Sequence, residues 1–185
     1  MKRILALILC LCMVLAGCGG AAPAETTEAP TTETTQPPIS IEEYSQMVSD
    51  SAAKIEKAAL GVGNLALYQV KFMTNLSKIS GNTNVPDDLL EKSLAWIEKN
   101  SDYTKDSMDA DFKENSADYK AIMMIKAPEE AAKIEELYDT YFTAYLNLYN
   151  LAMHPSSADA LATDGNEYIK TISTVKSQLD VLLSE

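Results

Sequence analysis

Apolar positions from residue 39 onward recur in steps of three and four. Gly61 and Gly63 interrupt the longest series, which consists of Ile41, Tyr44, Val48, Ala52, Ile55, Ala59, Val62, Ala66, Met73, Leu76 and Ile79. A helix has 3.6 residues per turn, so this spacing gathers the apolar side chains on one face and predicts a long helix. Each glycine weakens a helix by about 1 kcal/mol relative to alanine. We therefore expect a kink there, or the close approach of a neighbouring helix.

The beginning of this helix is well marked. Ser40, followed three residues later by Glu43, has the form of a capping box, and Ile39 and Tyr44 are spaced for the hydrophobic staple around it. The turn-rich segment 80–84 predicts the end of the helix. We therefore expect a folded domain that covers residues 39–185.

Three further helices are expected. Pro86 precedes two aspartates and Pro128 precedes two glutamates, and both patterns suit the first turn of a helix. Ser156 and Ser157 each offer a cap for the last helix. Segment 100–118 keeps the helical step but is rich in Asp, Ser and Asn, which predicts a helix with a frayed or broken middle. Short connections favour antiparallel neighbours, so the hypothesis is an all-α fold, an up-down antiparallel four-helix bundle.

A different pattern precedes the domain. After Met1-Lys2-Arg3, an apolar run of about 13 residues extends to Ala16, which suits the core of a signal peptide. The run is shorter than the roughly 20 residues of a membrane-spanning helix. It closes with Leu15-Ala16-Gly17-Cys18, which resembles the lipobox of bacterial lipoproteins. The resemblance implies that residues 1–17 are a signal peptide, that cleavage occurs before Cys18, and that Cys18 carries a diacylglyceryl thioether.

Residues 18–38 are expected to form a lipidated N-terminus and a tether. Positions 19–38 contain no Leu, Ile, Val, Met or aromatic residue and are rich in Thr, Pro and Glu. Such a segment buries too little apolar surface to offset its ordering entropy, which predicts disorder. Its reach is at most about 65 Å. The hypothesis is a protein held outside the cytoplasm at the cell membrane. Gly19 and the long spacer favour a single-membrane bacterium.

The charge of the chain limits its partners. The net charge is −12, and removal of Lys2 and Arg3 with the signal peptide leaves 13 basic against 27 acidic residues. Nucleic acid is therefore disfavoured, because its phosphates require clusters of Lys and Arg. Anionic lipid should also repel such a body. Apart from the lipid on Cys18, the expected partner is a protein, a wall component or a small ligand, and the sequence leaves these open.

The sequence contains few candidate catalytic residues. We therefore predict that the protein is not an enzyme and has no cofactor or metal site. His154 is the single histidine and stands at a predicted helix end, where a cap or loop role is expected. An acidic cluster is interpreted as a solvated face rather than a calcium loop, since the loop glycine is missing; it comprises Asp102, Asp106, Asp109, Asp111 and Glu114. The alternative function is a cell-envelope enzyme with paired carboxylates about 5–10 Å apart.

The third predicted helix is rich in aromatic residues. Its apolar stripe consists of Ile134, Tyr138, Tyr141, Tyr145, Leu148 and Ala152. We expect the three tyrosines of the stripe at core positions, with their hydroxyls at the rim. Phe142 and Tyr149 point off that stripe and are the first candidates for a partner surface. The favoured function from the sequence is a membrane-anchored, non-catalytic interaction module.

Overall fold

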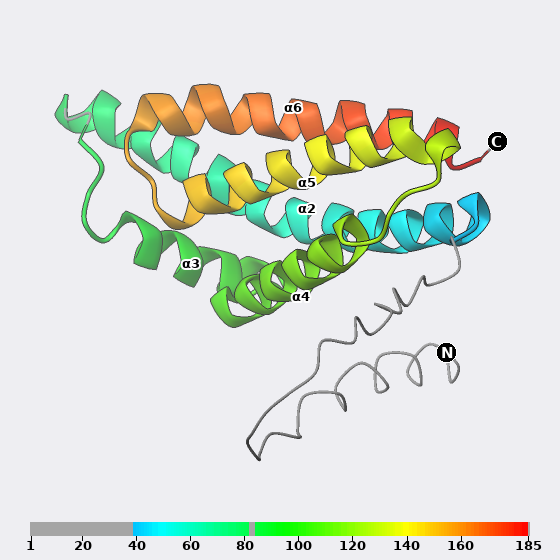
Figure 1. The fold of residues 1–185 in the computed structure, drawn as a ribbon. Coiled ribbons are helices and arrows are strands. Elements are labelled where there is room, and N and C mark those ends of the chain that lie inside the picture. Colours follow the sequence, from blue (N-terminus) through cyan, green and yellow to red (C-terminus); the bar gives the residue numbers. More distant parts are fainter. Residues whose placement is uncertain (1–38, 82–83, 185) are drawn as a thin grey trace, which may run out of the picture. The chain divides into compact units, whose positions relative to one another are not determined.

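The computed structural model describes residues 39–81 and 84–184, and within these ranges every regular element is a helix (Figure 1). The predicted signal peptide, Cys18 and the whole predicted tether (residues 18–38) lie outside the described residues. The helices are α2 (Ile41–Ser80), α3 (Leu89–Asn100), α4 (Lys105–Met123), α5 (Ala132–Met153) and α6 (Ala158–Leu182), and a 3-10 turn, η1 (Glu129–Ala131), precedes α5.

The expected ends of α2 are confirmed. The Ser40 hydroxyl accepts a hydrogen bond from the Glu43 backbone N–H at 3.1 Å, and the Glu43 carboxylate accepts one from the Ser40 N–H at 3.4 Å. Gly81 ends the helix in the left-handed conformation with φ 67°, which glycine adopts without a steric cost. The two glycines within α2 do not interrupt it.

The second predicted helix is in fact two helices. Its start lies at Leu89 rather than Pro86, and residues 101–104 separate α3 from α4. Thr104 caps α4 by accepting a hydrogen bond from the Ser107 N–H at 3.1 Å. The many polar residues that suggested a frayed helix therefore mark one defined break, followed by a continuous helix. The described chain contains five α-helices instead of the predicted four.

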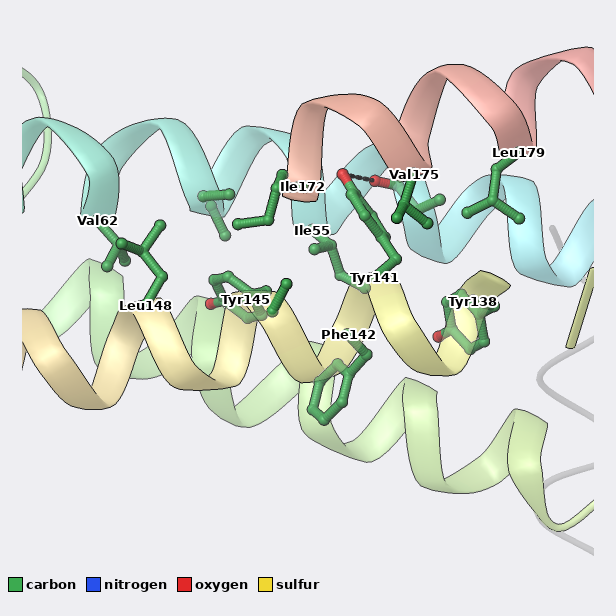
Figure 2. Packing of buried hydrophobic residues seen from close by; sticks show 14 of the residues in the cluster. Ile55, Val62, Tyr138, Tyr141, Phe142, Tyr145, Leu148, Ile172, Val175 and Leu179 are labelled. Carbon is green, nitrogen blue, oxygen red and sulfur yellow. Dashed lines mark hydrogen bonds between the residues drawn. The ribbon is translucent and has the colours of Figure 1, made fainter. Parts of the chain in front are cut away.

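Helix α2 packs against all the other α-helices, and α5 also contacts α6 and α4. Figure 1 shows α5 and α6 running along α2, with α3 and α4 on another side of it. The predicted face of α5 is confirmed as core, since each of its residues is at most 5% exposed; these are Ile134, Tyr138, Tyr141, Tyr145, Leu148 and Ala152. They meet Ile55 and Val62 of α2 and Val175 and Leu179 of α6 (Figure 2).

The hydroxyls of Tyr138, Tyr141 and Tyr145 are buried, which corrects the expectation that they lie at the rim. Tyr138 shares a hydrogen bond of 2.7 Å with Ser51, and Tyr141 donates one of 3.4 Å to the Ala52 carbonyl (Figure 2). Burial raises the pKa of Tyr138 to about 12. These phenols therefore stay neutral at physiological pH and act as core residues that also tie α5 to α2.

The two glycines of α2 meet different neighbours. An added Cβ at Gly61 would lie 2.6 Å from the Tyr103 ring, whereas one at Gly63 would lie 3.8 Å from Ile169. Tyr103 also donates a hydrogen bond of 2.7 Å to the Lys57 carbonyl. The close approach expected at the two glycines therefore occurs at Gly61. The group that approaches is the Tyr103 ring, from the connection between α3 and α4.

This difference predicts opposite effects of alanine at the two positions. Gly63→Ala should raise the free energy of unfolding by up to about 1 kcal/mol, because the methyl group fits and the helix gains propensity. Gly61→Ala should lower it, because displacement of Tyr103 removes a hydrogen bond worth about 0.5–1.5 kcal/mol together with the ring packing. Urea unfolding of both variants measures the difference. Equal stabilisation by the two alanines would contradict the packing at Gly61.

Candidate functional site

The structure places Phe142 and Tyr149, the predicted partner surface, against α4. Phe142 stacks on Tyr119 with ring centroids 4.0 Å apart, and Tyr149 stacks on Phe112 at 3.9 Å. Phe142 is only 5% exposed and Tyr149 is half-buried. Both rings do point off the main stripe of α5, and α4 of the same chain covers them. A partner could bind these two rings only if α4 moved away.

The contact between α4 and α5 is reinforced by two tyrosine–carboxylate hydrogen bonds. Tyr149 donates to Asp109 at 2.6 Å, and Tyr119 donates to Asp139 at 2.5 Å. The bond to Asp139 is the main reason that the pKa of Tyr119 rises to about 12. A fifth ring of this region, Tyr145, is fully buried beside Asn115. The seam between α4 and α5 is therefore a structural contact.

Three acidic residues of α4, namely Asp109, Glu114 and Asp118, form ion pairs with lysines. Lys105 lies 2.5 Å from Asp109, and Lys54 lies 2.7 Å from Glu114 and 2.8 Å from Asp118. The hydrogen bond from Lys105 lowers the pKa of Asp109, with a further contribution from Tyr149, and the bond from Lys54 lowers the pKa of Glu114. Both shifts favour the ionised form. A general acid requires the opposite shift, so these two carboxyls are poorly suited to donate a proton.

The Asp109 contacts predict a pH-dependent loss of stability. A carboxyl whose pKa is lower in the folded protein contributes stability above its unfolded pKa of about 3.9 and loses that contribution as the pH falls through the folded pKa. Asp109→Asn should therefore reduce stability at pH 7, by less than about 1 kcal/mol for such an exposed pair. The deficit should shrink under acid conditions. The test is to compare the urea midpoints at neutral and acid pH for wild type, for Asp109→Asn and for the matched α4 control Asp111→Asn. A loss of stability in Asp109→Asn that does not change with pH would contradict the predicted role of the ionised carboxylate.

Neither the position of His154 nor the arrangement of His, Cys, Asp and Glu side chains in the described residues indicates a catalytic or metal site. His154 is the exposed C-cap residue of α5, and its backbone N–H donates to the Asn150 carbonyl at 2.9 Å. This confirms the cap position expected from the sequence. Among residues 39–81 and 84–184, no three His, Cys, Asp or Glu side chains are grouped so that they could hold a metal ion.

Two shallow grooves lie on the surface of the helical body. The larger, about 700 Å³, runs between α5 and α6 and is open to solvent; its lining includes Lys133, Leu137, Ser177 and Val181. The smaller, about 400 Å³, lies between the start of α3 and the α5–α6 connection, near Pro86 and Pro155. The acidic residues of α4 lie outside both grooves, and the carboxylate that lines the smaller one is Asp87.

A second stripe of α2, which the sequence analysis missed, faces solvent. Leu60 is 66% exposed and Leu67 is 50% exposed. They are seven residues apart and so lie on the same helix face. Beside Leu67, Tyr68 stacks on Trp96 of α3 with ring centroids 4.3 Å apart, and Trp96 is 43% exposed. We call these four residues the Trp96 face.

Lysines surround the Trp96 face. Lys57 is one turn before Leu60, Lys71 is one turn after Leu67, and Lys99 is one turn after Trp96. All three are exposed, and none forms an ion pair with a residue in the described part of the chain. The spacing of seven between the two leucines was the signal that could have identified this face.

The comparisons with known proteins give no family. The chain matches no protein-family model, and no curated protein and no solved structure shows significant similarity to it. None of the helices in the described ranges combines the length and the apolar character needed to cross a bilayer.

Proposed function

We propose that this protein is a lipid-anchored module on the outer side of the cell membrane, and that its helical body binds a partner without catalysing a reaction. The observation that carries the proposal is Leu15-Ala16-Gly17-Cys18 at the end of a basic start and an apolar run. Cys18 would carry the diacylglyceryl group as the first residue of the mature chain. Two acyl chains on one residue hold a protein stably at a bilayer, whereas one holds it marginally.

The side chains of the body support binding rather than catalysis. Asp109 and Glu114 are paired with lysines and held ionised. The aromatic residues Phe142 and Tyr149 join α5 to α4. The Trp96 face presents apolar and aromatic side chains to solvent, and aromatic residues are enriched at binding surfaces. In this proposal the partner is not nucleic acid, because the acidic body would repel its phosphates.

The proposed architecture of the body is an antiparallel bundle of four helical segments. In it α3 and α4 together replace the single second helix that the sequence predicted. The four residues 154–157 between α5 and α6 support the reversal, because short connections join antiparallel neighbours. Such a body presents convex helix faces to a partner.

The test of the anchor is the chemical identity of the N-terminus. The protein would be extracted from membranes of its native host, and its N-terminal peptide analysed by mass spectrometry. We expect a peptide that begins at Cys18 and carries the mass of a diacylglyceryl group. A chain with residues 1–17 still attached, or an unmodified Cys18, would overturn the proposed function.

A further inference from the structure

We propose that the Trp96 face docks onto the anionic surface of the membrane that holds the anchor. This inference rests on the proposed lipid anchor and assigns an orientation to the anchored body. The docked surface consists of Leu60, Leu67, Tyr68 and Trp96, with Lys57, Lys71 and Lys99 at its edge.

The first support is the combination of side chains. Single exposed hydrophobic residues are common on protein surfaces and need no explanation. Within residues 39–81 and 84–184, three of the six large hydrophobic side chains that are strongly exposed belong to one face, namely Leu60, Leu67 and Trp96. Tryptophan and tyrosine prefer the interface between lipid and water, and surface-bound helices combine an apolar face with lysines. The Trp96 face has this composition.

The second support is charge complementarity within an acidic protein. Lys57, Lys71 and Lys99 remain available to an external anion, whereas Lys92, one turn before Trp96, is already paired with Asp88 at 2.7 Å. A lysine close to an anionic membrane contributes about 1 kcal/mol to binding. A docked phosphate-rich surface would therefore meet three free cations beside the apolar residues.

The acidic residues at the start of α2 do not prevent this contact. Glu42 and Glu43 at the start of α2 lie about 25 Å along the helix from Leu60, at a rise of about 1.5 Å per residue. The Debye length is about 8 Å at physiological ionic strength, so charges at that distance are largely screened. The electrostatic interaction with the membrane would therefore involve mainly the charges on the face that touches it. The repulsion expected from composition applies to the other faces.

The third support is the reach of the chain between the anchor and α2. The 22 residues from Gly19 to Ser40 separate Cys18 from Ile41, and a fully extended chain of that length spans about 75 Å. Leu67 lies about 40 Å along α2 from Ile41. The tether is therefore long enough for the Trp96 face to lie on the membrane that holds Cys18. The anchor would also keep the face at high effective concentration near that surface.

The sole tryptophan of the chain makes the test direct, because Trp96 reports the contact without a label. The lipidated mature protein, which begins at Cys18, would be reconstituted on phosphatidylcholine vesicles and on phosphatidylglycerol-rich vesicles, both with bromine-labelled lipid. We expect a blue shift and bromine quenching of Trp96 emission on the anionic vesicles only. The effect should disappear near 1 M salt, where the Debye length is about 3 Å.

The matched variants change the same number of charges on different faces. The double variant Lys71→Gln with Lys99→Gln should shift the docking equilibrium about 30-fold toward the undocked state. This follows from a loss of about 1 kcal/mol of membrane binding per lysine. Lys120→Gln with Lys170→Gln, exposed lysines outside the Trp96 face, should leave the quenching unchanged. Equal effects of the two double variants would show a non-specific charge effect and overturn the docking.

Flotation of the same vesicles separates failure of the docking from failure of the anchor. Protein that floats with the vesicles but shows no change in Trp96 emission would overturn docking and leave the anchor intact; the Trp96 face would then be left to a protein partner. Protein from the native membrane that does not associate with either kind of vesicle would overturn the anchor itself, and the docking with it.

Discussion

Leu65→Ala is expected to lower the free energy of unfolding by about 2–5 kcal/mol, as other buried leucine truncations do. Leu65 of α2 is fully buried, and the substitution removes three carbons from a packed core. The cost contains the lost transfer free energy and the free energy of the cavity that incomplete relaxation leaves. This is a large fraction of the 5–15 kcal/mol by which folded domains are stable.

The matched control for this experiment is Leu67→Ala on the same helix. Leu67 is 50% exposed, so its truncation should change the stability by no more than about 0.5 kcal/mol. Both changes carry the same helix-propensity difference, and burial is what distinguishes the two sites. Urea unfolding followed by circular dichroism measures both. Similar losses for the two variants would mean that α2 is rotated relative to the described packing.

The contrast between Leu65 and Leu67 also shows where sequence pattern reached its limit. The predicted stripe of α2 included Tyr44, Val48 and Ile55, which are buried. It omitted Leu65, because a single stripe describes a helix packed on one side, whereas α2 is packed by α5 and α6 and by α3 and α4. It also included Ile79, which is 87% exposed near the end of the helix. Local periodicity predicts that a face is buried but does not specify how many neighbours a helix has.

The same limit applies to the candidate site. The position of Phe142 and Tyr149 off the main stripe of α5 was predictable from helical geometry. The contact of α4 with these two rings was not predictable. It depends on the helix break at residues 101–104, which separates α4 from α3 and allows α4 to pack along α5. The sequence predicted that these rings form a surface for a separate partner, whereas in the structure Phe142 stacks on Tyr119 of the same chain. Local signals with a defined geometry, such as the Ser40 cap, were predicted correctly.

Cys18→Ala is expected to abolish lipid attachment, because alanine has no sulfur to form the thioether. Without the acyl chains the mature body has no covalent hold on the bilayer, so its retention should depend only on the apolar residues and lysines of the Trp96 face. One apolar surface patch or one acyl chain gives marginal, reversible binding, in contrast to the stable anchoring by two chains. We therefore expect loss of fatty-acid labelling and loss of the mature, salt-resistant membrane-bound form.

The matched control is Cys12→Ala, which replaces the same residue type within the apolar run. It should keep the fatty-acid label, the processing before Cys18 and the salt-resistant membrane fraction. Labelling of cells with a tagged palmitate, followed by gel mobility and fractionation of wild type and both variants, makes the comparison. Label that persists in Cys18→Ala, or that disappears equally in Cys12→Ala, would contradict Cys18 as the attachment site. The helical content of the body should be unchanged in both variants, since the fold begins at Ser40 and Ile41.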